Sequence, residues 1–158
     1  MKKMKNMLLC VSLLTLCAVL LGACSGGKKV SVDPAALAKD LASEAVTSEE
    51  LTQIADSMVA ATYYIPDDTY AAGWAYKGSG ATACEVAVIE CKKAEQTKDV
   101  EKLLQDHVDS QSELYASYNP DEVKKLDKAL IKSAGTYVVL CVCDNEDQAT
   151  SIFKKAGF

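Results

Sequence analysis

Two pairs of strand-like segments constrain the fold of this chain more than any other sequence feature. The first pair covers Tyr70–Lys77 and Ala83–Lys92, and the second pair covers Lys128–Ala134 and Tyr137–Cys143. A short turn that contains glycine separates the two members of each pair. Strand-like segments joined by such turns are typical of β-hairpins, so the sequence predicts two of them.

Helical patterns lie between and after these hairpins. An apolar stripe predicts a long helix over residues 96–117, and Asn119-Pro120 ends it and starts a short helical turn. After the second hairpin, Asp144 or Asn145 is expected to cap a last helix with one apolar face.

Two further helices are predicted before the first hairpin. Asp33 and Pro34 suit the cap and the first position of a helix. Thr47 and Glu50 have the spacing of a capping box, and apolar residues follow at helical intervals over Leu51–Val59. We therefore expect a second helix through Leu51–Val59.

The order of these elements, ααββαββα, predicts one α+β domain over residues 33–158. The two hairpins are expected side by side in a four-stranded, mainly antiparallel sheet, joined by the long helix. The more apolar strand of each hairpin should be central, and helices should pack on at least one face of the sheet.

The N-terminal residues predict export from the cytoplasm. Three lysines precede an apolar run over Met7–Ala23, which is shorter than the roughly 20 residues of a transmembrane helix. A positive start, an apolar middle and small residues at the end are typical of a signal peptide, here residues 1–23.

The end of this run, Leu21-Gly22-Ala23-Cys24, resembles the bacterial lipobox. The resemblance implies recognition of these residues by a dedicated signal peptidase, cleavage after Ala23 and a diacylglycerol on Cys24. Residues 24–32 would then form the lipidated cysteine and a flexible tether. The alternative is an ordinary secretory signal or membrane span that contains a cysteine.

Composition argues against nucleic acid as a partner. The chain has 22 acidic residues against 17 lysines and no arginine, for a net charge of −5. Phosphate neutralisation and bidentate base contacts both favour arginine.

Four cysteines remain beyond the proposed lipid site: Cys84, Cys91, Cys141 and Cys143. All fall in predicted strands, and they can be small core residues, one structural disulfide, or a metal or catalytic thiol site. Cys141 and Cys143 lie two apart on one strand face, which is too far for an easy disulfide between them. Cys91 could meet either of them across neighbouring strands.

Few other residues suggest chemistry. His107 lies on the apolar stripe of the long helix, where a packed histidine is the simplest interpretation. The acidic group that begins at Asp144 does not have the ligand pattern of a calcium loop. We therefore predict no metal, no cofactor and no catalytic residue.

Aromatic residues gather shortly before and within the first hairpin. Tyr63, Tyr64, Trp74 and Tyr76 are the candidates for a binding surface, because tyrosine and tryptophan dominate interface hot spots. The alternative is that Trp74 and Tyr76 simply cover one face of the sheet.

Three stretches resemble the bacterial domain of unknown function family 4358: residues 78–88, residues 118–122 and residues 135–140. Together with the sequence between them, the resemblance covers about residues 50–155. It implies a lipoprotein, mostly of Gram-positive bacteria, and no established activity. The family usually has apolar or acidic residues at the four cysteine positions, which favours the core interpretation of these thiols.

These observations predict a non-enzymatic binding or accessory module, anchored by lipid to the outer face of the cytoplasmic membrane. Its expected partners are the membrane, through the anchor, and another envelope protein. The alternative is a cell-surface hydrolase or thiol-dependent enzyme that uses His107 with a cysteine or a carboxylate. A third alternative is a redox or metal carrier that uses Cys141 and Cys143.

Overall fold

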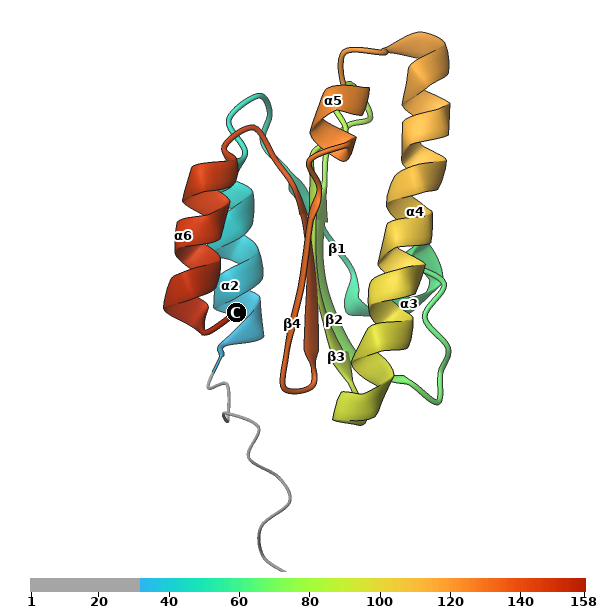
Figure 1. Cartoon of the computed structure of the whole chain (residues 1–158), viewed down its shortest axis with the longest axis vertical. Coiled ribbons are helices and arrows are strands. Elements are labelled where there is room, and N and C mark those ends of the chain that lie inside the picture. Colours follow the sequence, from blue (N-terminus) through green and yellow to red (C-terminus); the bar gives the residue numbers. More distant parts are fainter. Residues whose placement is uncertain (1–31) are drawn as a thin grey trace, which may run out of the picture.

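The computed structural model describes residues 32–158, which form a sheet covered by helices on both faces (Figure 1). The predicted signal peptide, the predicted lipobox and all but the last residue of the predicted tether lie outside the described residues. The elements in chain order are α2 (Pro34–Asp40), η1 (Leu41–Ala45), β1 (Thr52–Ile54), α3 (Asp56–Thr62), β2 (Tyr70–Lys77), β3 (Glu85–Cys91), η2 (Ala94–Gln96), α4 (Thr97–Tyr118), α5 (Val123–Leu126), β4 (Leu130–Ala134), β5 (Tyr137–Val142) and α6 (Glu146–Ala156).

The sheet has five strands in the order β1-β2-β3-β5-β4, and all neighbours are antiparallel. Helices α2 and α6 cover one face, and α4 covers the other (Figure 1). Each face has its own hydrophobic cluster, one with Leu41 and Phe153 and the other with Leu104 and Tyr63. Strand β3 separates the two clusters, because its side chains alternate between them.

The α+β class and the side-by-side hairpins are confirmed. The most apolar strands, β3 and β5, pair with each other inside the sheet, and β4 forms an edge. The number of strands is different from the prediction, because a fifth strand, β1, pairs with β2 through Thr52–Lys77, Gln53–Tyr76 and Ile54–Ala75.

The second predicted helix is therefore wrong over its first half. Residues 52–54 are a strand, and only Asp56–Thr62 is helical. The capping box does not form, because the backbone N–H groups of Thr47 and Ser48 donate to Asp144 Oδ2 at 2.7 and 2.8 Å. Contacts with residues distant in the sequence thus override a local helix signal.

The ends of the other helices agree with the sequence more closely. Asp33 caps α2 by accepting from the N–H groups of Ala35 and Ala36. Asn145, rather than Asp144, caps α6 by accepting from Gln148 N at 3.0 Å. Asp144 is free for another role because it lies before the cap.

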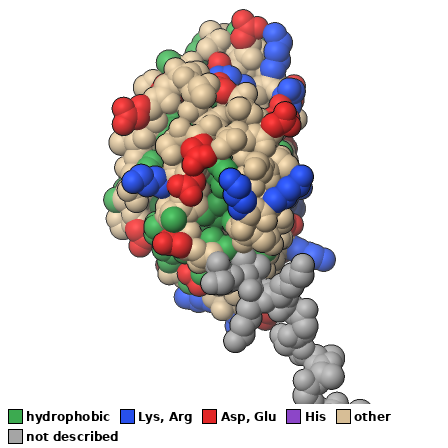
Figure 2. All heavy atoms as spheres, turned by 90° about the vertical axis from the view of Figure 1, so that its left-hand side faces the viewer, with side chains coloured by type: hydrophobic (Ala, Val, Ile, Leu, Met, Phe, Trp, Pro, Cys, Tyr) green, Lys and Arg blue, Asp and Glu red, His purple; other side chains and the backbone are tan. Residues whose placement is uncertain are grey.

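The face covered by α2 and α6 has apolar side chains exposed between charged ones (Figure 2). A shallow groove of about 250 Å³ lies between the two helices, with Leu37 and Ile152 in its lining and Asp40 and Lys155 among its charged residues. No helix within residues 32–158 is long and apolar enough to cross a membrane.

Candidate functional site

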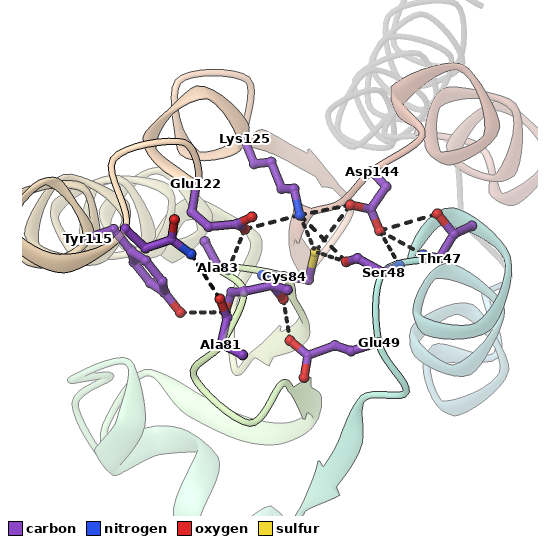
Figure 3. A network of polar contacts seen from close by, with 12 residues as sticks. Thr47, Ser48, Glu49, Ala81, Ala83, Cys84, Tyr115, Glu122, Lys125 and Asp144 are labelled. Carbon is purple, nitrogen blue, oxygen red and sulfur yellow. Dashed lines mark hydrogen bonds and ion pairs between the residues drawn. The ribbon is translucent and has the colours of Figure 1, made fainter.

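Two clusters of charged side chains lie near one end of the sheet, where β2 ends and β3 begins. We call them the Glu85 cluster (Glu85, Lys77, His107 and Tyr63) and the Lys125 cluster (Lys125, Glu122, Asp144, Ser48 and Cys84). The Glu85 cluster lies on the α4 face of the sheet. The Lys125 cluster lies at the end of the sheet, and its lysine belongs to α5 (Figure 3).

In the Glu85 cluster, three side chains from different elements converge on one carboxylate. Glu85 is only 2% exposed, although it lies at the start of a strand. Its Oε1 lies 2.8 Å from His107 Nε2 on α4, and its Oε2 lies 2.7 Å from Lys77 Nζ at the end of β2. Tyr63 donates its hydroxyl to the same Oε2 at 3.3 Å. A buried carboxylate is costly unless it is paired in this way.

Burial and pairing act in opposite directions on this carboxylate. Burial raises the pKa of Glu85, but the hydrogen bond from His107 and the charge of Lys77 outweigh it and lower the pKa overall. The same burial, together with the charge of Glu85, raises the pKa of Tyr63 well above its usual value. The group is therefore held as a charged carboxylate beside a neutral phenol.

Two adjoining cavities lie above the Glu85 cluster, along one side of α4. One has a volume of about 470 Å³ and is lined by Tyr64, Lys77 and His107, with Leu103, Asp106, Ser110, Gln111 and Thr62. The other, about 170 Å³, shares Lys77 and Gln111 and continues past Leu114 to Tyr118. We call the two together the α4 groove.

Exposed apolar side chains border this groove. Tyr64 is 78% exposed, Tyr118 is 54% exposed and Leu114 is 52% exposed. They make up three of the four large hydrophobic side chains that are exposed within residues 32–158, and the fourth, Met58, does not line the groove. Apolar surface gathered along a cavity is typical of an interaction site.

Tyr64 also has an unfavourable backbone conformation. Its φ of 55° is the only positive φ of a non-glycine residue in the described part of the chain. Such a conformation costs of order 1–2 kcal/mol, and residues of this kind cluster at functional sites. With this backbone conformation the ring of Tyr64 is exposed, whereas the ring of the preceding residue, Tyr63, is buried.

The Lys125 cluster holds a cation between two carboxylates (Figure 3). Lys125 Nζ lies 3.0 Å from Glu122 Oε2 and 2.8 Å from Asp144 Oδ1. Burial lowers the pKa of Lys125, but the two carboxylates outweigh it and raise the pKa. Burial likewise raises the pKa of Asp144, and Lys125 with the N–H groups of Thr47 and Ser48 lowers it overall.

Glu122 of this cluster and neighbouring side chains also fix the loop between β2 and β3. Glu122 Oε2 accepts from Ala83 N at 2.8 Å, and Asn119 Nδ2 donates to Ala81 O at 3.1 Å. The Tyr115 hydroxyl donates to Thr82 O, and Glu49 accepts from the hydroxyl of the same threonine. Two of the stretches that resemble the 4358 family, residues 78–88 and 118–122, are therefore in direct contact.

All four cysteines of the described chain are free and buried, as the core interpretation predicts. Cys84, Cys141 and Cys143 belong to the cluster under α2 and α6, whereas Cys91 faces α4. Cys91 therefore does not meet Cys141 or Cys143, which the sequence had allowed. Cys84 and Cys143 lie one residue outside β3 and β5 rather than within them.

The aromatic candidates separate in the structure. Tyr64 is exposed at the α4 groove, and Tyr63 is buried beneath it. Trp74 and Tyr76 are partly buried against the cluster under α2 and α6, so they cover a sheet face. His107 contacts a carboxylate, Glu85, and not a cysteine. Within residues 32–158 no group of three or more histidine, cysteine or acidic side chains is arranged to hold a metal ion.

Sequence reasoning missed Glu85 and Lys125. Glu85 stands at the start of an almost continuously apolar strand, and an acid in such a position signals a buried charge that needs partners. Lys125 stands in a run of polar residues and has no such signal.

Comparison with known proteins identifies a family. The sequence model described as "Domain of unknown function (DUF4358)" matches residues 44–143. No curated protein and no solved structure matches significantly. The matched range includes the Glu85 cluster, the α4 groove and every member of the Lys125 cluster except Asp144. The chain belongs to the DUF4358 family.

Proposed function

We propose that this chain is a lipoprotein on the outer face of the cytoplasmic membrane, and that it binds an extended segment of another envelope protein in the α4 groove. The observation that carries the proposal is the α4 groove. Exposed side chains of Tyr64, Leu114 and Tyr118 border it, and residues of the Glu85 cluster line its base.

The anchor follows from the resemblance of residues 21–24 to a lipobox. A diacylglyceryl Cys24 would supply two acyl chains, which is what stable attachment requires. The tether from Ser25 to Val32 spans on the order of 15 Å when flexible. The domain would therefore stay close to the membrane.

The orientation of the domain is compatible with this arrangement. The first turn of α2, where the tether joins, lies at one end of the molecule (Figure 1). Helix α5 and the end of α4 lie at the opposite end, so the Tyr118 end of the α4 groove would point away from the membrane.

The shape of the groove favours an extended polypeptide. Its lining follows α4 from Leu103 to Tyr118, which is about 22 Å at 1.5 Å per residue. An extended chain of six or seven residues has roughly that length. Aromatic side chains such as Tyr64 and Tyr118 are enriched at protein interfaces and are frequent among their hot spots.

The test is crosslinking in intact cells followed by purification of the protein and identification of what it carries. Tyr64→Ala should reduce the recovered partner at least about tenfold, since loss of one hot-spot residue costs roughly 2 kcal/mol. Met58→Ala is the matched control, because Met58 is also exposed but lies outside the groove. Equal loss in both variants, or no loss in either, would contradict the proposal.

A second candidate function is hydrolysis or another reaction that uses His107 and Glu85. It is favoured by the 2.8 Å contact between His107 Nε2 and Glu85 Oε1 and by the cavity of about 470 Å³ that His107 lines. A histidine oriented by a carboxylate can act as a general base. If the chain acts as an enzyme, His107→Gln should abolish its activity in cells while the crosslinked partner is still recovered. If the chain acts by binding, its activity in cells should be lost only in variants that also lose the partner.

A further inference from the structure

Three of the four cysteines share one face of the sheet. Cys84, Cys141 and Cys143 pack with Val86 and Val139 in the cluster under α2 and α6. All three are nearly inaccessible, and Cys143, at 7%, is the most exposed of them. Three free thiols on one face of an exported domain raise the question of which pair can join.

The register between β3 and β5 answers this question. The pairs run from Glu90–Tyr137 to Glu85–Val142, so each step adds one residue on β3 and removes one on β5. The next step beyond Glu85 and Val142 places Cys84 opposite Cys143.

Backbone hydrogen bonds define the type of this pair. Cys91 N donates to Thr136 O at 2.8 Å, so odd-numbered residues of β3 form the hydrogen-bonded pairs with β5. Gly78 N donates to Cys84 O at 3.3 Å, so the carbonyl of Cys84 faces β2 instead. Cys84 and Cys143 therefore stand at a non-hydrogen-bonded position, where Cα atoms are about 4.5 Å apart.

That separation lies within the range for a disulfide, whose Cα atoms are usually about 4.4–6.8 Å apart. Other pairs fit less well. Cys141 stands opposite Val86, and its neighbour Cys143 lies two residues away on the same strand face. Cys91 lies on the other face.

We propose that Cys84 and Cys143 form a cross-strand disulfide when the protein meets an external disulfide, and that this site is a redox modification site of the domain.

The reaction is a thiol–disulfide exchange in two steps. Local opening at the end of β5 exposes Cys143, whose thiolate attacks one sulfur of the external disulfide, forms a mixed disulfide and releases one thiolate. The Cys84 sulfur then attacks the Cys143 sulfur, loses its proton, and releases the second thiolate. The two protein thiols give up two electrons and two protons, and the external disulfide becomes two thiols.

The surroundings of the two sulfurs suit these roles. A hydrogen bond from Cys141 lowers the pKa of Cys143 despite burial, so Cys143 has the greater thiolate character. Burial raises the pKa of Cys84, which makes it a poor first nucleophile. Cys84 Sγ contacts Ser48 Oγ at 3.6 Å, Lys125 Nζ at 3.7 Å and Asp144 Oδ1 at 3.8 Å. Oxidation would therefore alter the Lys125 cluster directly.

The experiment exposes the full chain, purified in detergent, to oxidised glutathione in native buffer. Remaining thiols are alkylated after unfolding, and the protein is digested without reduction by trypsin and a glutamate-specific protease. Cleavage after Glu85 and Glu90 separates Cys84 from Cys91. Fragmentation of the peptide between Cys141 and Cys143 then locates the linked sulfur. We expect Cys84 joined to Cys143 in most molecules, with Cys91 and Cys141 alkylated.

Matched variants check the assignment. Cys141→Ala and Cys91→Ala should retain the linkage, whereas Cys143→Ala should abolish it. The map of the unmodified protein decides the matter if a variant fails to fold. Alkylation of both Cys84 and Cys143, or a linkage through Cys141 or Cys91, would overturn the proposal. The result does not depend on any partner in the α4 groove, so it is read separately from the proposed function.

Discussion

The two charged clusters lie near the same end of the sheet but are built in opposite ways. In the Glu85 cluster, an almost completely buried carboxylate receives three side-chain donors, from β2, α4 and the end of α3. In the Lys125 cluster, a partly exposed cation lies between two carboxylates that also accept from backbone N–H groups.

This difference indicates that the Lys125 cluster has a structural role and that the Glu85 cluster is the candidate for a functional one. Backbone contacts in the Lys125 cluster join the loops before β1, before β3 and after β5, so the cluster holds chain segments together. The Glu85 cluster makes only side-chain contacts and lies under the α4 groove. A charged group buried beneath a cavity is a candidate functional feature, whereas a charged group that ties loops together is a structural one.

The largest effect is expected at Glu85. Glu85→Ala removes the carboxylate and leaves Lys77, His107 and Tyr63 without their shared partner. Breaking a buried pair from one side costs about 3–5 kcal/mol, measurable as the free energy of unfolding in urea. Glu95→Ala, at an exposed glutamate, is the control and should change stability by less than about 0.5 kcal/mol. If the two substitutions changed the free energy of unfolding equally, the buried contacts of Glu85 would not contribute to stability as described.

A smaller effect is expected in the Lys125 cluster. Lys125→Met leaves Glu122 and Asp144 without their cation, but both carboxylates keep their backbone donors. We expect a loss of about 2 kcal/mol in the same unfolding measurement, as for hydrogen bonds to charged groups. Lys124→Met is a matched control, because the Lys124 ion pair is largely exposed. If Lys125→Met costs more than Glu85→Ala, the ranking of the clusters is wrong.

Acid should weaken the Lys125 cluster through Asp144. The folded-state pKa of Asp144 is lowered, so its contribution is complete above the unfolded value of about 3.9 and is lost as pH falls below it. Between pH 6 and pH 3 this loss amounts to about 1 kcal/mol. Asp144→Asn should therefore flatten the pH dependence of unfolding by about this amount. An unchanged slope would show that Asp144 is not the responsible group.

The smallest effect concerns the strained tyrosine at the groove. Tyr64→Gly should raise stability by about 0.5–1 kcal/mol, because glycine adopts a positive φ without steric cost. Tyr64→Ala removes the same ring and keeps the strain, so it should not be stabilised. Thermal unfolding of the two variants measures the difference. If the two variants have the same stability, the backbone of Tyr64 is not strained, and its conformation is no longer an argument for a functional site.

The sequence predicted the hairpins, the long helix and the central place of β3 and β5, because these depend on local periodicity and on runs of apolar residues. It failed at Thr47–Ile54, where the sequence has the pattern of a capping box and helical spacing, because contacts with Asp144 and pairing with β2 are stronger than these local signals. Local patterns cannot show a partner that lies about a hundred residues away.

The candidate site was predictable only in part. Tyr64 and His107 were identified as residues of interest, but nothing in their spacing joins them to Lys77 and Glu85. The ladder between β2 and β3 and the packing of α4 bring these residues together. The pairing of Cys84 with Cys143 likewise needs the register of β3 and β5, which hairpin prediction alone does not provide.

The most direct test of the proposed binding role is photo-crosslinking from a single position in living cells. A photoreactive residue at Leu114, inside the α4 groove, should capture one protein partner in the membrane fraction. The same residue at Met58, which is equally exposed outside the groove, should capture none. Capture from both positions, or from neither, would contradict the account of the α4 groove as the binding surface.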